Sequence, residues 1–428
     1  MKSTVLEEDA KYVWHPFTQM QTAGSPLSIV KAKDATLYTE DGRSYLDCNS
    51  SWWVNTHGHG NEYIKEAIVR QFEAIDHTIF AGATHPKAVE LSRRIAELLP
   101  GDLNKVFFSD DGSTAIEVAL KMCIQYWYNK DRPKTKVLAL DGAYHGDTFG
   151  AMSIGQRGAF NRPFEQLFFD VDFLPFPSSE KEEEVLELAR CYFETGDFAC
   201  LIVEPLVQGS AGMRMYRADF LEKLFQLARK NGVLIICDEI MTGWGRTGMM
   251  FALNYIETVP DIVCLSKGLT AGVLPLGLTV ATEQIYNAFL APEKVKALLH
   301  GHSYTGNPLA CAAACANLDL TEQPGFMENI QRVSANHRRF TELLERSQGI
   351  KETRMLGTII AIEMEIPSGV SSYYSELADK ASAFFLEKGL LIRPLGNIIF
   401  LNPPYCITDE ELEYVYQVIQ SFIAQCVA

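Results

Sequence analysis

Apolar and polar residues follow two alternating patterns along most of this chain. Short apolar runs rich in β-branched residues are typical of strands buried on both faces of a parallel sheet. Between them, apolar residues recur every three or four positions, as in amphipathic helices. The predicted strands are Val106–Ser109, Val137–Leu140, Leu201–Glu204, Val233–Asp238, Ile262–Leu265 and Leu278–Ala281. The predicted helices are Asn61–Ile75, Pro86–Leu99, Ser113–Tyr128, Ala218–Asn231 and Pro308–Leu320. This alternation predicts an α/β domain with a mostly parallel sheet.

The pattern changes after about residue 325, where a smaller α+β domain is predicted. Its expected elements are a long helix (Met327–Ser347), a strand (Thr358–Met364), a helix (Tyr373–Lys388), two short strands (Leu391–Arg393 and Ile398–Leu401) and a final helix. Residues 1–60 are predicted to form irregular structure and short strands. We therefore expect an N-terminal segment at 1–57 that packs with the small domain, a large domain at 58–325 and a small domain at 326–428.

Composition narrows the class of protein. The chain has 428 residues, 47% of them hydrophobic and 21% charged, which is ordinary for a globular protein. The first residues contain no apolar stretch of the kind found in signal peptides, so a cytoplasmic location is expected. Ten scattered cysteines without a CxxC pair fit a reducing compartment. The net charge of −16 argues against binding to nucleic acid or to anionic membranes.

Two residues at the ends of predicted strands carry the candidate chemistry. Asp238 closes one apolar run, and Lys267 lies just beyond the next. Because the carboxyl ends of parallel strands meet at one edge of a sheet, we expect the carboxylate and the amine at the same site. A pyridoxal phosphate enzyme needs such a pair, since the lysine forms a Schiff base with the aldehyde and the aspartate keeps the ring nitrogen protonated. Each residue alone would more often be a cap or a solvated side chain.

Three other features of the sequence suggest a dinucleotide site, a phosphate cradle or a metal site. Gly243, Gly245 and Gly248 match the dinucleotide-binding pattern G-x-G-x-x-G, but they follow an acidic pair and precede no clear helix. The stretch 109–113 between a strand and a strong helix is a better phosphate cradle, although an ordinary helix cap also explains it. Four histidines match no known metal-ligand spacing, so no metal site is predicted at His57, His59, His300 or His302.

Taken together, the motifs identify a family. From about Tyr12 to Tyr405 the chain resembles the class III aminotransferases, which have the fold-type-I pyridoxal phosphate architecture. The motifs that carry this resemblance are WHPFTQM (14–20), SSWW (50–53), YHGDTFGAMS (144–153), VEPLVQGSAGMRMY (203–216), DEIMTGWGRTG (238–248), SKGLTAG (266–272), HGHSYTGNPLACAAA (300–314) and IRPLGNIIFLNPPY (392–405). Three of these motifs, SSWW, GMRMY and LNPPY, resemble the corresponding stretches of the members that aminate 8-amino-7-oxononanoate in biotin biosynthesis.

The resemblance implies a role for individual residues. Lys267 is the implied catalytic residue, Asp238 the partner of the ring nitrogen and Tyr144 the residue that stacks on the ring. Ser303 is implied to reach the phosphate across a homodimer, and Arg393 to bind a substrate carboxylate. The full implied set is Asp111, Gly112, Tyr144, Asp238, Lys267, His302 and Ser303 for pyridoxal 5'-phosphate, and Phe17, Trp52, Tyr144, Gly301 and Arg393 for the substrates.

The motifs indicate the amino donor less clearly than they indicate the family. Members that use S-adenosylmethionine usually have Tyr at the position of Phe17 and HGPTF where this chain has HGHSY. We expect S-adenosylmethionine as donor and keep lysine, or another ω-amine, as the alternative. Two hypotheses from other classes are a dinucleotide-binding protein built on Gly243–Gly248 and a catalytically silent relative that only binds ligands.

Overall fold

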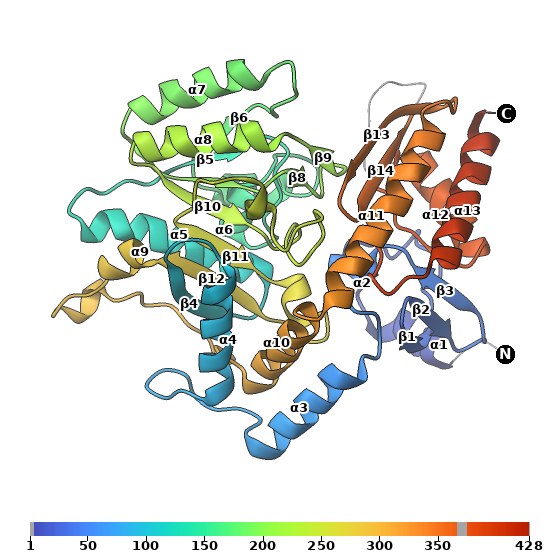
Figure 1. Ribbon diagram of the computed structural model, residues 1–428, viewed down its shortest axis with the longest axis horizontal. Coiled ribbons are helices and arrows are strands. Elements are labelled where there is room, and N and C mark those ends of the chain that lie inside the picture. The colour runs from blue at the N-terminus through green and yellow to red at the C-terminus, as the bar shows by residue number, and fades with distance from the viewer. Residues whose placement is uncertain (1–3, 366–374, 428) are drawn as a thin grey trace.

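The computed structural model describes residues 4–365 and 375–427 (Figure 1). Its helices are α1 (Thr4–Tyr12), α2 (Ser50–Trp53), α3 (Glu62–Ala74), α4 (Pro86–Leu98), α5 (Gly112–Asn129), α6 (Phe149–Ser153), α7 (Glu182–Glu194), α8 (Ala218–Lys230), α9 (Glu283–Asn287), α10 (Pro308–Thr321), α11 (Pro324–Leu344), α12 (Glu376–Glu387) and α13 (Asp409–Val427). Short 3₁₀ helices are η1 (Arg162–Leu167), η2 (Ala252–Tyr255), η3 (Lys267–Thr270) and η4 (Lys294–Lys296). Within the described residues, no helix is both long and apolar enough to cross a membrane.

A seven-stranded sheet forms the centre of the larger part of the molecule. Its order is β4-β12-β11-β10-β7-β5-β6. The chain from β11 through β10, β7 and β5 to β6 is parallel throughout, whereas β12 is antiparallel to both of its neighbours. The strands are β4 (Leu103–Ser109), β5 (Lys136–Leu140), β6 (Val171–Leu174), β7 (Phe198–Val203), β10 (Leu234–Asp238), β11 (Ile262–Leu265) and β12 (Gly277–Thr282). The prediction of an α/β fold with a mostly parallel sheet is confirmed.

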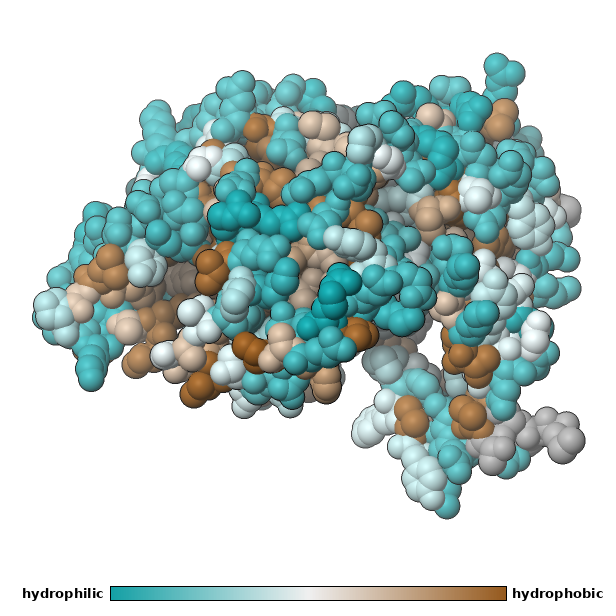
Figure 2. Space-filling view, turned by 60° about the horizontal axis from the view of Figure 1, so that its bottom comes forward, coloured by the Kyte–Doolittle hydropathy of each residue, from teal (hydrophilic) through white to brown (hydrophobic). Residues whose placement is uncertain are grey.

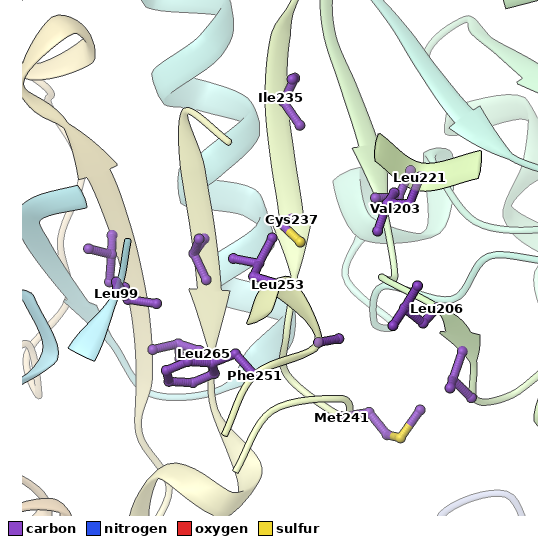
Figure 3. Close-up of a cluster of buried hydrophobic side chains, with 14 of the residues drawn as sticks. Leu99, Val203, Leu206, Leu221, Ile235, Cys237, Met241, Phe251, Leu253 and Leu265 are labelled. Atoms are coloured by element: carbon purple, nitrogen blue, oxygen red, sulfur yellow. The ribbon is translucent and has the colours of Figure 1, made fainter. Parts of the chain in front are cut away.

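Both faces of this sheet are covered, which explains why its strands are apolar without alternation. Along β10, Ile235 and Cys237 belong to one core cluster and Leu234 and Ile236 to the other, because successive side chains point to opposite faces. The first cluster packs against α4, α7, α8 and α10, and the second against α5 and α9. Figure 3 shows part of the first cluster, where side chains of β7, β10 and β11 meet Phe251 and Leu253.

The remaining strands lie in two small sheets and one hairpin. A four-stranded sheet has the order β1-β2-β3-β15 and joins the N-terminal region to the C-terminal region through the parallel pair β3 and β15. A three-stranded antiparallel sheet has the order β13-β14-β16, and α11, α12 and α13 lie beside it (Figure 1). The strands are β1 (Ile29–Lys33), β2 (Thr36–Thr39), β3 (Ser44–Asp47), β8 (Val207–Gln208), β9 (Arg214–Met215), β13 (Ile350–Leu356), β14 (Ile359–Met364), β15 (Leu390–Leu391) and β16 (Ile398–Leu401).

Several elements differ from the sequence-based expectation. The helix α1 was not expected, and neither were β6 and β13. The helix α11 begins three residues before the predicted Met327, because Pro324 occupies the first turn, where a missing N–H is tolerated. The predicted start of a helix at Tyr373 lies outside the described residues, and the described helix α12 begins at Glu376. Arg393 follows β15 rather than lying within it.

Candidate active site

The two strand ends singled out in the sequence lie next to each other. Asp238 is the last residue of β10, which pairs in parallel with β11 so that Asp238 faces Cys264. Lys267 follows β11 and opens η3 with a left-handed φ of 46°. Both side chains line the same cavity. The sheet therefore delivers one carboxylate and one amine to one site.

A buried histidine holds the Asp238 carboxylate. His145 donates from Nδ1 to Oδ2 of Asp238 at 2.6 Å, and the N–H of Ile240 donates to Oδ1 at 3.0 Å. The Asp238 side chain is only 5% exposed and that of His145 is fully buried. The other ring nitrogen of His145, Nε2, is buried without a partner among the described residues. The carboxylate is thus fixed in one orientation and keeps lone pairs for a cationic N–H group in the cavity.

A second carboxylate, Glu204, lines the cavity at the end of β7. It accepts hydrogen bonds from the N–H groups of Tyr144 and Gly209, each at 2.8 Å. Burial raises the pKa of Glu204 to about 7, with the nearby His145 lowering it and Asp238 raising it. Glu204 can therefore exchange a proton near neutral pH, whereas an exposed glutamate would stay ionised.

The amine of Lys267 is prepared to react as a neutral group. Burial lowers the pKa of Lys267 to about 8, although Asp238 and Glu204 act in the opposite direction. Its Nζ lies 4.6 Å from the centroid of the Trp53 ring, so an indole covers one side of the amine. A lowered pKa is typical of lysines that act as nucleophiles or as acid–base groups.

A strained turn places Trp53 in the cavity. Ser51 and Trp53 have φ values of 59° and 66°, a conformation that non-glycine residues rarely adopt. The buried carboxylate of Asp47 accepts hydrogen bonds from the Ser51 N–H at 2.7 and 2.8 Å, and His59 donates to it at 2.9 Å. These bonds hold the turn, with Trp53 buried and Trp52 at the surface.

The N-terminus of α5 forms one wall of the cavity. Gly112 and Ser113 line it, and among the described residues the N–H groups of both lack an acceptor. Asp111 is the N-cap, and its carboxylate accepts from the Thr114 N–H at 2.7 Å, so it faces the helix. At Gly146, a Cβ would lie 2.1 Å from Oγ of Ser113, so only glycine fits there. Free N–H groups at the positive end of a helix suit a phosphate.

The residues implied to bind substrate lie in three places, of which the stretch with Gly301 is described below. Tyr144 lines the cavity, and its hydroxyl donates to Asp147 at 2.9 Å; burial raises its pKa. Trp52 does not line the cavity, but the guanidinium of Arg393 lies 4.7 Å from its ring and Phe17 packs edge-on at 5.5 Å. Trp52, Phe17 and Arg393 thus form a partly exposed aromatic and cationic cluster, with Trp52 one residue from Trp53.

The stretch 301–303 lies outside the cavity of its own chain. Gly301 and Ser303 are exposed, and Nε2 of His302 is 3.8 Å from a carboxylate oxygen of Asp110. The single chain therefore brings together Lys267, Asp238, Tyr144 and Gly112, but not Gly301, His302 or Ser303.

The glycine-rich loop after β10 has a structural role that argues against a dinucleotide site. Arg246 is buried in this loop and donates to the carbonyl oxygens of Asn55 at 2.7 Å and of Pro403 at 2.8 Å. Its guanidinium also lies 4.8 Å from the ring of Tyr405. The loop joins segments distant in sequence and opens no α-helix that would offer a dipole to a pyrophosphate.

Sequence reasoning missed several residues that line the cavity. His145, Glu204 and Ser210 were not assigned a role, Ser113 was included only in the predicted phosphate cradle 109–113, and the substrate role was given to Trp52 instead of Trp53. Glu204 carried the same signal as Asp238, since both end an apolar strand. Trp53 could not be distinguished from Trp52, because adjacent residues in a strained turn point in directions that no periodicity predicts.

Comparison with known proteins gives a consistent result. The family model described as Aminotransferase class-III matches residues 18–423. The adenosylmethionine-8-amino-7-oxononanoate aminotransferase of Synechococcus elongatus is 46% identical, with 96% of this chain and 98% of the relative covered. The enzyme of that name from Methanocaldococcus jannaschii has a crystal structure with a TM-score of 0.93 and 35% identity, covering 98% of each chain. A PLP-bound amine transaminase structure from an uncultivated Pseudomonas species has a TM-score of 0.89 and 29% identity, covering 97% of this chain and 99% of that one.

Proposed function

The chain belongs to the class III aminotransferases, and we propose that it transfers an amino group from S-adenosylmethionine to 8-amino-7-oxononanoate, giving 7,8-diaminononanoate in biotin biosynthesis. The observation that supports the reaction type is the meeting of Lys267 and Asp238 in one cavity beside the N-terminus of α5. The observation that supports the substrates is the 46% identity to the Synechococcus elongatus enzyme over nearly the whole of both chains.

Pyridoxal 5'-phosphate is the cofactor of this family, and the residues present fit it. The free N–H groups of Gly112 and Ser113 match a phosphate, and the Asp238 carboxylate, held by His145, matches a protonated ring nitrogen. When bound, the cofactor supplies an aldehyde for amines and a ring that accepts electrons. Tyr144 also lines the cavity, which supports a role for it as the aromatic residue that covers the ring.

The residues of this chain then have separate tasks. Lys267 would hold the cofactor covalently, and its neutral amine would move a proton at the carbon that carries the transferred nitrogen. Asp238 keeps the proton on the ring nitrogen, because a carboxylate beside it favours the charged form. Trp53 covers one side of the amine and excludes water from it, which strengthens these charge interactions. Both half-reactions use the same groups in opposite directions.

The aromatic and cationic cluster of Phe17, Trp52 and Arg393 is the proposed substrate-recognition surface. The fork of Arg393 suits the carboxylate of either substrate, and its place over the Trp52 ring keeps it oriented. The exposed faces of Phe17 and Trp52 suit the adenine of the donor by stacking. The Tyr hydroxyl that Phe17 lacks is worth about 0.5–1.5 kcal/mol, roughly tenfold in affinity, which is too small to exclude that donor.

The active unit is proposed to be a homodimer in the cytoplasm. Ser303 and its neighbours lie outside their own cavity, which suits a role in the phosphate site of a partner subunit. Large apolar side chains near this stretch are exposed, among them Val295 at 77% and Leu299 at 74%. Figure 2, which brings the side of α3 and α4 forward, shows hydrophobic side chains on that face between hydrophilic ones. Such surface is typical of an interface.

Steady-state assays with each donor test this proposal. Purified holoenzyme is incubated with 8-amino-7-oxononanoate and either S-adenosylmethionine or lysine, and 7,8-diaminononanoate is measured by mass spectrometry. Product with S-adenosylmethionine alone supports the proposal. If product forms with lysine but not with S-adenosylmethionine, the proposed donor is wrong. If product forms with neither donor, the proposed acceptor is wrong.

A further inference from the structure

A second cavity lies between the β8–β9 hairpin and the three-stranded sheet, and none of the residues that line it lines the active-site cavity. One wall comes from the loop after β6 and from β9, and the other from β13 and β14. Four cationic side chains and three carboxylates line it, in a chain whose net charge is −16. The cations outnumber the carboxylates by one, in contrast to the negative net charge of the whole chain.

Arg214, on β9, is the cation without an acidic partner. Its guanidinium carbon lies over the Phe176 ring, 3.7 Å from the ring centroid, in a cation–π contact. Among the described residues, its side chain makes no hydrogen bond and no ion pair within 4 Å. Burial lowers the pKa of Arg214, and the positive charge of Arg354 lowers it further. The negative charges of Asp141 and Glu363 raise it. Stacking leaves the N–H groups at the edge of the guanidinium free for a bidentate partner.

Arg354, on β13, contributes a second positive charge. Its Nη1 donates to Glu352 at 2.6 Å and to Glu363 at 2.7 Å, and its Nη2 donates to the Gly212 carbonyl at 2.9 Å. Its Nε is buried without a partner among the described residues, and the side chain is 8% exposed. This Nε has no accessible surface, so Arg354 acts on a ligand in the cavity through its charge and not through a direct hydrogen bond from Nε.

The carboxylates of the cavity are already bound. Glu363 accepts from Lys351 at 2.7 Å as well as from Arg354. Glu182 accepts from Arg217 at 2.8 Å at the rim. These acids therefore do not compete for Arg214. Ser178, Ser179 and Gln156 also line the cavity and add neutral polar groups.

We propose that this cavity binds a small organic oxyanion, held by the guanidinium of Arg214, with the positive charge of Arg354 in the same cavity. The oxyanion group is a carboxylate or a phosphate, since both fit a planar fork of N–H donors. Its ligand joins the β8–β9 hairpin to the three-stranded sheet. It also touches the loop 209–213, in which Ser210 lines the active site and Ala211 lines this cavity. This inference is independent of the proposed function.

Calorimetric titration of the cofactor-saturated holoenzyme with inorganic phosphate and, separately, with glutarate tests the proposal. Saturating the cofactor first removes phosphate binding at the N-terminus of α5. We expect saturable binding of at least one probe, weakened about tenfold or more in Arg214→Gln. Arg217→Gln is the matched control, because Arg217 lines the same cavity but is already paired, and it should bind as the native protein does. Arg214→Lys keeps the charge without the fork and should bind more weakly than the native protein.

Hydrogen–deuterium exchange locates the site in the same samples. Bound ligand should protect residues 209–216 and 351–363, and this protection should be absent in Arg214→Gln, whose fold is checked by circular dichroism and by its cofactor spectrum. Three results would overturn the proposal. They are no binding of either probe in the millimolar range, equal binding by the native protein and Arg214→Gln, and protection confined to other parts of the chain.

Discussion

His145 and Asp238 form a buried hydrogen bond of 2.6 Å between the ends of β5 and β10, which one strand, β7, separates in the sheet order. Asp238 closes β10, and His145 lies in the loop after β5. The bond matters because an aspartate can hold a ring nitrogen protonated only if its carboxylate points into the cavity. The family resemblance implied the aspartate, and the fold supplies the residue that orients it.

Replacing His145 tests this orienting role. His145→Ala removes a hydrogen bond to a charged group, worth about 1.5–3 kcal/mol, so we expect kcat to fall about 10- to 150-fold. His145→Asn places an N–H near the original Nδ1 and should recover part of the loss. If both variants turn over at the native rate while binding cofactor normally, His145 has no positioning role.

Asp238→Asn keeps the shape of the side chain and removes its charge. We expect the rate constant of each half-reaction to fall by about a hundredfold or more, because a neutral amide no longer favours the proton on the ring nitrogen. Cofactor affinity should change much less, since Gly112, Ser113 and Lys267 remain. Single-turnover kinetics measures the rate and equilibrium dialysis the affinity. An unchanged single-turnover rate would contradict the role of Asp238.

The lowered pKa of Lys267 predicts how cofactor binding depends on pH. The neutral amine reacts with the aldehyde, and with a pKa of about 8 roughly a tenth of Lys267 is neutral at pH 7. The rate at which the apoenzyme takes up pyridoxal phosphate should therefore rise with pH up to about 8 and then level off. Stopped-flow absorbance measures this rate, and Lys267→Ala, which cannot form the covalent bond, is the control. A rate that continues to rise toward pH 10.5 would show that the pKa of Lys267 is not lowered.

The proposed sharing of the phosphate site between subunits predicts complementation. Lys267→Ala inactivates the site of its own chain, whereas Ser303→Asp, which adds a negative charge, should inactivate the site of the partner subunit. Each variant alone should be inactive. Random reassembly of equal amounts should restore about a quarter of native activity, because about half of the dimers are mixed and each mixed dimer has one intact site. If Ser303 serves its own chain, the mixture stays inactive.

Part of this architecture could be predicted from the sequence because the signal was strong and local. The apolar runs that end at Asp238 and near Lys267 fix two buried strands, and the free N-terminus of α5 follows from Gly112 after a strand. By contrast, β13 carries charged residues on its exposed positions and was missed, since its pattern is not that of a buried run. The reversed direction of β12 could not be inferred, because an apolar strand has the same pattern in both directions. His145 and Asp238 meet only in the tertiary structure, and no local pattern in the sequence predicts a contact between residues so far apart along the chain.

The most direct test of the central claim follows the visible absorbance of the cofactor through one complete cycle. Holoenzyme receives S-adenosylmethionine alone, then, after removal of the donor, 8-amino-7-oxononanoate alone. The proposed function predicts that the band of the aldehyde form disappears in the first step, returns in the second and yields 7,8-diaminononanoate equal to the active sites. Lys267→Ala should show neither change. A band that lysine removes and S-adenosylmethionine leaves intact would contradict the donor, and a band that 8-amino-7-oxononanoate fails to restore would contradict the reaction itself.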